Sequence, residues 1–290
     1  MQPTLLCDCR CELGEGAFWH PGLEKLCWVD IGAHTLHWCD PSGSRHGSRR
    51  FDEPVTKILP ASDGKLILAL GRGLARYDLQ KGSLEWLTAI GGGEAGLRCN
   101  DGHCDAAGRL WIGIMHEQSV PGAGALYCVH PDLRVEKKLD KVSVPNGIAW
   151  SPDGKRMFFI DSARRCVASY HYDPDTAGIA FERTAIRIPA EAGLPDGMAM
   201  DEEGKLWICH WGGGGVYRWD PRNGSLLDKI CLQAPQVTSC AFSGDGLRAL
   251  VITTARKGLS AGQLQQFPLS GSVFHVSLPV KGVPVTPFAG

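Results

Sequence analysis

The chain has 290 residues, of which 43% are hydrophobic and 21% charged, an ordinary composition for a folded globular protein. Thirty basic residues balance 31 acidic ones, so no strong overall field is available to hold nucleic acid or an anionic membrane. No apolar run approaches the roughly 18 residues that a membrane helix needs, and residues 1–12 lack the features of a secretory signal. We therefore expect a soluble, cytoplasmic protein that binds neither nucleic acid nor a membrane.

Twelve cysteines are scattered along the chain, and without a secretory signal we expect them to be reduced thiols. Cys7, Cys9 and Cys11 alternate, a spacing that on a strand places three thiols on one face. Such a face is able to bind a soft metal, but no Cys-x-x-Cys pair is present to complete a tetrahedral zinc site. We therefore favour small buried apolar residues at these positions and leave their role open.

A repeated unit organises the chain. Each copy contains a turn with a glycine, a short apolar strand, a second turn and an aromatic-rich strand. The expected strand pairs are 22–30 with 36–41, 64–68 with 74–78, 108–113 with 124–128, 154–160 with 167–174, 204–208 with 215–221, and 246–252 with 271–276. The glycines that open the copies are 42 to 50 residues apart: Gly22, Gly64, Gly108, Gly154, Gly204 and Gly246. This period predicts a β-propeller, in which four-stranded blades surround a central channel.

Six copies of the unit fill the chain, so we predict an all-β fold, a single six-bladed β-propeller domain over residues 1–290. No helical periodicity separates the strands, which disfavours an alternation of strands and helices. Because an open ring leaves two unpaired sheet edges, we expect a strand from one terminus to complete the blade of the other. The run Gly212–Gly215 lacks the strand-to-helix setting of a phosphate loop and is expected to be a hairpin connection.

One position of the repeat presents oxygen in all six copies. It lies eight residues before the opening glycine in five copies and seven before it in the first, at Glu15, Thr56, Asn100, Asn146, Asp196 and Thr238. A position on the innermost strand that is polar in every blade is expected to point into the central channel. Carboxylate and amide oxygens there suit Ca²⁺, Mg²⁺ or Mn²⁺ and can also hold Zn²⁺ or Fe²⁺. The alternative is a polar channel lining that binds only ordered water.

Other chemically active side chains are weaker candidates. Four isolated histidines are interpreted as hydrogen-bonded structural residues: His20, His103, His116 and His210. Three aspartates that precede glycine or lie in a loop are interpreted as turn formers: Asp101, Asp153 and Asp245. No Gly-x-Ser-x-Gly segment is present, which weighs against a serine hydrolase.

Several segments resemble the regucalcin (senescence marker protein) and gluconolactonase family. They are residues 13–19 (Leu-Gly-Glu-Gly-Ala-Phe-Trp), 98–102 (Arg-Cys-Asn-Asp-Gly), 145–147 (Pro-Asn-Gly), 195–197 (Pro-Asp-Gly) and 254–258 (Thr-Ala-Arg-Lys-Gly). The likeness spans nearly the whole chain and looks strongest to the bacterial sugar-lactone hydrolases of the family. It implies a six-bladed propeller with one divalent metal in the channel. By this resemblance the metal ligands are Glu15, Asn146 and Asp196, while Arg98 and Asn100 face the substrate.

The resemblance further implies a metal-dependent lactonase that hydrolyses a sugar lactone of the glucono-, xylono-, arabinono- or galactonolactone type, with Asp196 as the base. A substrate-facing glutamate of the regucalcin branch falls at Gln118 here, although Glu117 is adjacent. Specificity is expected to depend on the loop 116–124 and on two further residues, Trp211 and Arg256. The lactone, the native metal and the oligomeric state stay open. A single propeller needs no partner to bury its core, so we expect a monomer or a weak homo-oligomer.

Two alternatives remain. The first is a related metal hydrolase that acts on another ester, such as an organophosphate or an aryl ester, because the same cation polarises a P=O group or an ester carbonyl. The second is a non-catalytic calcium-binding propeller whose outer surfaces bind partners. The presence of Arg98 together with all three expected metal ligands argues against this second alternative.

Overall fold

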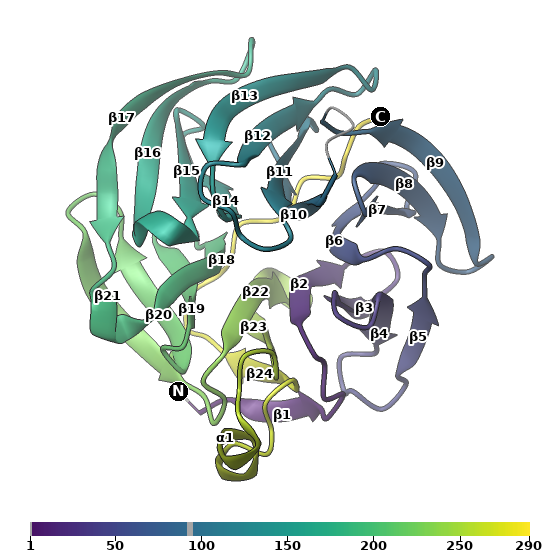
Figure 1. Ribbon diagram of the computed structural model, residues 1–290, viewed down its shortest axis with the longest axis vertical. Helices are drawn as coiled ribbons and strands as arrows, with labels where there is room; N and C mark the ends of the chain where they lie inside the picture. Colours follow the sequence, from purple (N-terminus) through teal and green to yellow (C-terminus); the bar gives the residue numbers. More distant parts are fainter. Residues whose placement is uncertain (1, 92–94) are drawn as a thin grey trace.

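Six antiparallel four-stranded sheets surround a central axis in the computed structural model, which describes residues 2–91 and 95–290 (Figure 1). The first three sheets contain β2 (Gly14–His20), β3 (Lys25–Asp30), β4 (Thr35–Cys39) and β5 (Gly47–Arg50); β6 (Val55–Pro60), β7 (Leu66–Leu70), β8 (Gly73–Asp78) and β9 (Ser83–Ala89); and β10 (Leu97–Cys104), β11 (Leu110–His116), β12 (Gly124–Val129) and β13 (Val135–Val142). The next two contain β14 (Pro145–Trp150), β15 (Arg156–Asp161), β16 (Cys166–Asp173) and β17 (Gly178–Arg187); and β18 (Leu194–Met200), β19 (Leu206–Trp211), β20 (Gly215–Asp220) and β21 (Ser225–Cys231). The predicted all-β, six-bladed propeller is confirmed.

The sixth sheet joins the two ends of the chain. Its order is β22 (Val237–Ser243), β23 (Ala249–Thr254), β24 (Val273–Ser277) and then β1 (Thr4–Cys7). In the antiparallel pairing of β1 with β24, Thr4 lies opposite His275 and Leu5 opposite Phe274. The expected closure by a terminal strand is therefore confirmed, and it covers an edge of β24 that would otherwise be unpaired.

The glycines that revealed the repeat lie in the turn between the first and second strand of each blade. Five of the six have a positive φ, a conformation that glycine adopts without steric cost: Gly64, Gly108, Gly154, Gly204 and Gly246. The expected hairpin connection at Gly212–Gly215 is also present, because these residues link β19 to β20. Turn chemistry therefore explains why the sequence period could be read so directly.

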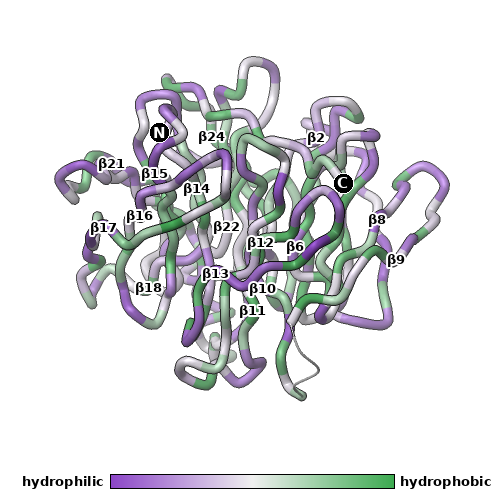
Figure 2. The backbone as a smooth tube through the Cα atoms, turned by 90° about the horizontal axis from the view of Figure 1, so that it is seen from above, coloured by the Kyte–Doolittle hydropathy of each residue, from purple (hydrophilic) through white to green (hydrophobic). Residues whose placement is uncertain are grey.

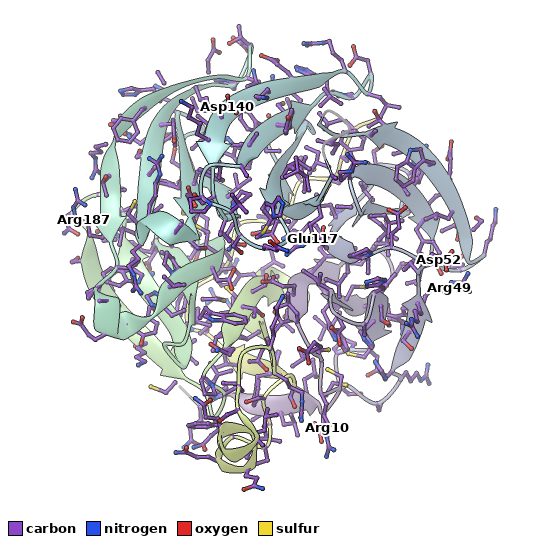
Figure 3. All side chains as sticks on the ribbon, in the orientation of Figure 1. Arg10, Arg49, Asp52, Glu117, Asp140 and Arg187 are labelled. Atoms are coloured by element: carbon purple, nitrogen blue, oxygen red, sulfur yellow. The ribbon has the colours of Figure 1, made fainter. Side chains whose placement is uncertain are left out.

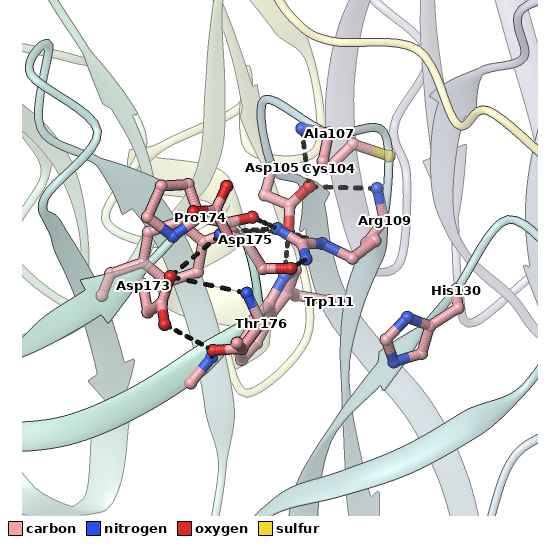
Figure 4. Close-up of polar contacts among 12 residues, drawn as sticks. Cys104, Asp105, Ala107, Arg109, Trp111, His130, Asp173, Pro174, Asp175 and Thr176 are labelled. Atoms are coloured by element: carbon pink, nitrogen blue, oxygen red, sulfur yellow. Dashed lines mark hydrogen bonds and ion pairs between the residues drawn. The ribbon is translucent and has the colours of Figure 1, made fainter.

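Apolar residues concentrate along the strands inside the ring, and hydrophilic residues dominate many of the turns (Figure 2). Polar networks also connect neighbouring blades. In one of them the carboxylate of Asp105 accepts hydrogen bonds from Arg109 Nε (2.7 Å) and Trp111 Nε1 (2.9 Å) (Figure 4). The same guanidinium donates to the backbone oxygen of Pro174 in the next blade. Such contacts fix the blades, and hence the strands that line the channel, relative to one another.

Among the described residues, three short 3₁₀ turns and one short helix interrupt the strands: η1 (Ser162–Arg164), η2 (Ala190–Ala192), η3 (Asp245–Leu247) and α1 (Ala261–Gln266). The helix was not predicted, because six residues are too few to show helical periodicity. Its start is nevertheless encoded by a capping box, in which Gln263 N donates to Ser260 Oγ (3.3 Å) and Ser260 N donates to Gln263 Oε1 (3.0 Å). No helix in the described part of the chain has the length and apolar character needed to cross a membrane.

The cysteines near the N-terminus do not alternate along a strand as expected. Strand β1 ends at Cys7, and Arg10 has a positive φ of 52°, so the chain turns between Cys9 and Cys11. The turn brings the sulfur atoms of Cys9 and Cys11 to 3.5 Å from each other. All twelve cysteines are free. Within residues 2–91 and 95–290, no group of three or more His, Cys, Asp or Glu side chains is arranged to hold a metal ion, so the soft-metal interpretation gains no support.

The C-terminal segment, residues 278–290, crosses one face of the ring, a course that no sequence pattern indicated (yellow in Figure 1). At its start Leu278 N donates to Arg248 O (2.7 Å) in the sixth blade, and further along Val283 N donates to Met200 O (3.0 Å) in the fifth. Near its end Phe288 N donates to Pro60 O (2.8 Å) in the second blade, and Ala289 N donates to Gly108 O (3.0 Å) at the third. The segment therefore bridges the face of the propeller on which the innermost strands end.

Candidate functional site

The predicted polar position lies where the innermost strands leave the regular ladder of hydrogen bonds. In β14, Pro145 pairs with Asp161 and Ile148 pairs with Phe159, so Asn146 lies in a β-bulge. The same irregularity occurs at the equivalent position of four other blades, at Thr56, Asn100, Asp196 and Thr238. Bulges commonly re-aim a side chain, and here they occur at the mouth of the channel.

The first blade follows the same register, although its bulge begins one residue later. In β2, Glu15 is paired with Val29, and the bulge falls on Gly16 and Ala17. The pairs on either side of the bulge match those of β14, since Gly14 and Trp19 lie opposite Asp30 and Leu26 as Pro145 and Trp150 lie opposite Asp161 and Met157. Glu15 therefore occupies the same place in its blade as Asn146 does in the fourth, as the spacing predicted. Its carboxylate faces the shared channel, since its charge acts on Asp196.

Glycine follows two of the candidate ligands because the channel walls leave no space for a side chain. A Cβ atom on Gly147 would lie 2.5 Å from Met198 Cγ and 3.0 Å from Asp196 O in the next blade. A Cβ on Gly197 would lie 2.9 Å from Thr238 O, again in the next blade. The Pro-Asn-Gly and Pro-Asp-Gly segments therefore combine an oxygen ligand with the close approach of neighbouring innermost strands.

The environment at the channel mouth disfavours the ionised forms of two carboxylates, those of Glu15 and Asp196. Burial, together with the negative charge of Asp101, raises the pKa of Glu15 to about 7. Burial also raises the pKa of Asp196 well above its usual range, and the charges of Glu15 and Asp101 add to this effect. Neither carboxylate forms an ion pair with a Lys or Arg side chain in the described part of the chain. The site therefore concentrates negative charge that a cation would neutralise.

A hydrogen-bond network orients the amide of Asn146. Its Oδ1 accepts from Asn100 Nδ2 (2.9 Å), and its Nδ2 donates to Ser162 Oγ (2.7 Å). Asn100 Oδ1 in turn accepts from Arg98 Nη1 (2.7 Å). The amide oxygen of Asn146 keeps a second lone pair, so the network holds it as a possible metal ligand.

The two threonines of the repeat do not contribute in the same way. Thr238 Oγ1 donates to Gly14 O (2.5 Å) and shares a hydrogen bond with Thr253 Oγ1 (2.9 Å). Thr56 Oγ1 lies 3.5 Å from Ala69 O. Both hydroxyls are thus used within the walls of the channel, and the expectation that all six oxygens converge is wrong for these two.

A cavity of about 490 Å³ adjoins the site, lined in part by Arg98, Glu117, Arg72 and Trp86. Arg98 is buried, and although its Nη1 is occupied by Asn100 and by Cys99 O (2.8 Å), its Nε and Nη2 donate to no residue in the described part of the chain. Burial lowers the pKa of Arg98, and the charge of Glu117, near the centre of the ring, is close enough to oppose this shift (Figure 3). Glu117 thus joins Arg98 at this cavity.

Gln118, the predicted substrate contact, is exposed, and its backbone N donates to His116 Nδ1 (3.2 Å). Its contact with substrate stays a prediction, as do the roles of Trp211 and Arg256. All four histidines form hydrogen bonds, as predicted: besides His116, His20 Nε2 lies 3.1 Å from Gly64 O, His103 Nδ1 lies 3.1 Å from Cys104 O, and His210 Nδ1 lies 2.8 Å from Ala192 O.

Sequence reasoning missed a buried ion pair beside the site. Asp101, interpreted as a turn former, lies within β10 and places Oδ1 2.7 Å from Lys57 Nζ. The Asp-Gly pair suggested a turn, but here it occupies the bulge of an innermost strand. In the sequence, the only sign of a partner for Asp101 was Lys57 itself, a charged residue among the mainly apolar residues of β6.

The chain matches the family model of the SMP-30/Gluconolactonase/LRE-like region over residues 13–256. It belongs to this family. It is 34% identical to regucalcin of Bos taurus, over 97% of this chain and 96% of that protein, and 33% identical to the putative sugar lactone lactonase YvrE of Bacillus subtilis, over 100% and 99%. The structure of the calcium-binding protein regucalcin from Agrobacterium tumefaciens superposes with a TM-score of 0.94 at 28% identity, covering 100% of this chain and 98% of that one.

In this SMP-30/gluconolactonase family member, the residues that fit a metal are half-buried Glu15, buried Asp196 and buried Asn146. Two carboxylates and an amide oxygen form a hard donor set that suits a divalent cation with water in its remaining positions. The repulsion between Glu15 and Asp196 is the observation that supports the fit, because a bound cation would convert it into attraction.

Proposed function

We propose that the protein is a divalent-metal-dependent lactonase that hydrolyses a sugar lactone to the aldonic acid. The observation that carries the proposal is the pair of uncompensated carboxylates, Glu15 and Asp196, beside the oriented amide of Asn146 and next to the cavity of Arg98. These three oxygen donors would hold the cation, and their chemistry suits Ca²⁺, Mg²⁺, Mn²⁺, Zn²⁺ or Fe²⁺. The lactonase name of one relative supports the choice of substrate class.

A divalent cation held by Glu15, Asn146 and Asp196 would supply Lewis-acid polarisation of the lactone carbonyl and would stabilise negative charge on its oxygen. In this proposal Asp196 accepts a proton from the attacking water and returns it to the ring oxygen as the ester bond breaks. Arg98 Nε and Nη2 donate to oxygens of the sugar, and Asn100 keeps Arg98 in place through the 2.7 Å hydrogen bond to Nη1. Glu117 accepts hydrogen bonds from sugar hydroxyls.

The test is hydrolysis of a panel of aldonolactones by protein that has been stripped with a chelator and then given one cation at a time. We expect activity to vanish on stripping and to return with at least one ion. Glu15→Gln should lose both activity and cation affinity, whereas Asp153→Asn, at an exposed turn, should lose neither. The lactonase proposal fails if no lactone opens faster than in buffer with any ion.

The same panel separates the two other functions. Adding an aryl ester and an organophosphate detects a hydrolase of another ester. Cation binding by calorimetry without any hydrolysis would indicate a calcium-binding propeller, a role worth testing because the similar regucalcin of Agrobacterium tumefaciens is a calcium-binding protein. We further propose that the substrate is a freely diffusing small molecule in the cytoplasm and that the protein acts as a monomer or weak homo-oligomer, without nucleic acid or membrane.

A further inference from the structure

The channel contains a second space at the end opposite the candidate metal site. The candidate ligands lie at the starts of the innermost strands, whereas this chamber is lined from the later parts of the same strands. Its volume is about 240 Å³, and apolar side chains dominate its wall. Several of them retain a little exposure although they lie deep in the fold: Met198 6%, Met200 6%, Cys240 5%, Ala241 7% and Phe242 5%. They therefore face an internal space and not a filled core.

The C-terminal segment spans the mouth of this chamber. Residues 283–286 contribute to its lining, and Val283 keeps 40% of its surface exposed at the rim. The segment is fixed by backbone hydrogen bonds on either side, from Val283 N to Met200 O and from Phe288 N to Pro60 O. The mouth is thus shaped by a tethered segment, and the chamber is open at its edge.

Lys57 and His103 both line this mainly apolar wall, and the charge of Lys57 acts on the ring of His103. His103 Nδ1 is 3.1 Å from Cys104 O, and because a carbonyl only accepts, Nδ1 carries the hydrogen. Burial, together with the charge of Lys57, lowers the pKa of His103 to about 4, so its ring is neutral and Nε2 is an acceptor. Within the described chain Nε2 has no hydrogen-bond partner, and Lys57 Nζ has only Asp101. Among the residues that line the chamber, His103 therefore offers an acceptor and Lys57 a donor, and Trp150 Nε1 is a second donor without a partner in the described chain.

We propose that this chamber binds a small phenol, with the ring among the apolar side chains and the hydroxyl between Lys57 and His103. The hydroxyl oxygen accepts from Lys57 Nζ, and its hydrogen is donated to His103 Nε2. The volume is sufficient, since an apolar cavity of about 150 Å³ in another protein binds benzene. Phe18, Trp150 and the sulfur of Met198 supply aromatic and polarisable contacts to such a ring.

The test is to titrate chelator-stripped protein with phenol and, separately, with toluene, and to measure binding by tryptophan fluorescence and by calorimetry. Toluene has a similar ring but no hydroxyl. We expect saturable one-to-one binding of both, with phenol about tenfold tighter. His103→Phe should bring phenol to the affinity of toluene and leave toluene unchanged. His171→Phe, at an exposed histidine of the fourth blade, is the matched control and should change neither.

Filling the chamber provides the second arm of the test. Ala241→Leu should abolish binding of both rings, and if that variant does not fold, Ala199→Leu, on the same wall, replaces it. The proposal is overturned if neither ring binds wild type saturably, if phenol and toluene bind equally, or if the filled variant binds as well as wild type. Because the protein is stripped of metal throughout, these results are independent of the lactonase proposal.

Discussion

The ammonium of Lys57 lies 2.7 Å from a carboxylate oxygen of Asp101 inside the channel, and the two side chains keep only 10% and 9% of their surface exposed. On one side of this pair, the charge of Asp101 helps to raise the pKa of Glu15 and Asp196. On the other side, Lys57 lines the apolar chamber. The ion pair thus separates the candidate metal site from the second space at the opposite end of the channel.

Asp101→Asn should destabilise the fold by about 3 kcal/mol, because it leaves the buried ammonium of Lys57 without a counter-charge. Urea unfolding of the variant and of wild type at neutral pH measures the difference. Asp63→Asn is the control, since it breaks the 3.1 Å pair with Lys65 in which both side chains are more than a third exposed. Its effect should stay below about 1 kcal/mol. Equal effects of the two substitutions would show that the buried pair has no special importance.

Asp196→Asn should abolish lactone hydrolysis without weakening the metal-free fold. Burial and the charge of Glu15 disfavour the ionised form of Asp196, so a neutral amide of the same shape removes repulsion. We expect the melting temperature of stripped Asp196→Asn at pH 8 to equal or exceed that of stripped wild type. Asp105→Asn makes the contrast, because this buried carboxylate accepts from Arg109 and Trp111 and its loss should lower the melting temperature. Retained hydrolysis by Asp196→Asn would remove this residue from the mechanism.

The sequence could predict the blades because their turns are locally determined. The positive φ at a position such as 108 favours glycine, and the same turn recurs in five blades. This preference depends on the local backbone and not on contacts with distant residues. The register of the polar position was equally predictable in all six blades. The β-bulge at this position was not predicted, because it is a property of the pairing between two strands, such as β2 and β3, and pairing is not visible in the spacing of one strand.

Other features depend on contacts between distant residues and left no local signal. The C-terminal segment carries no repeat pattern, and Phe288 packs near Leu59 and Leu110, which lie far away in the sequence. The pairing of Lys57 with Asp101 joins two blades in the same way. Glu117, and not Gln118, lines the cavity beside Arg98. Which of these two neighbours reaches the cavity depends on the register of their loop, and a shift by one residue would exchange them.

Acid should destabilise the protein through His210. Burial lowers the pKa of this histidine to about 4, against 6.5 in an unfolded chain. Below pH 6.5 the unfolded state therefore binds more protons than the folded state, and stability falls as the pH is lowered. Between pH 7 and pH 5 this amounts to about 2 kcal/mol. In urea unfolding, His210→Gln should flatten the dependence by that amount, and the exposed His171→Gln should not. An unchanged slope in His210→Gln would contradict the assignment.

Phe288→Ala should destabilise the fold by about 3 kcal/mol, because it empties a fully buried site between the second and third blades. Phe181→Ala removes the same group from a side chain that is 63% exposed and should cost less than about 1 kcal/mol. Chemical unfolding of the two variants tests whether the C-terminal segment is part of the cooperative fold. If both variants unfold like wild type, the segment lies on the propeller without stabilising it, and the mouth of the chamber is not held by a fixed anchor. If only Phe288→Ala loses much stability, the C-terminal segment is anchored in the core, and this anchor fixes the shape of the chamber mouth.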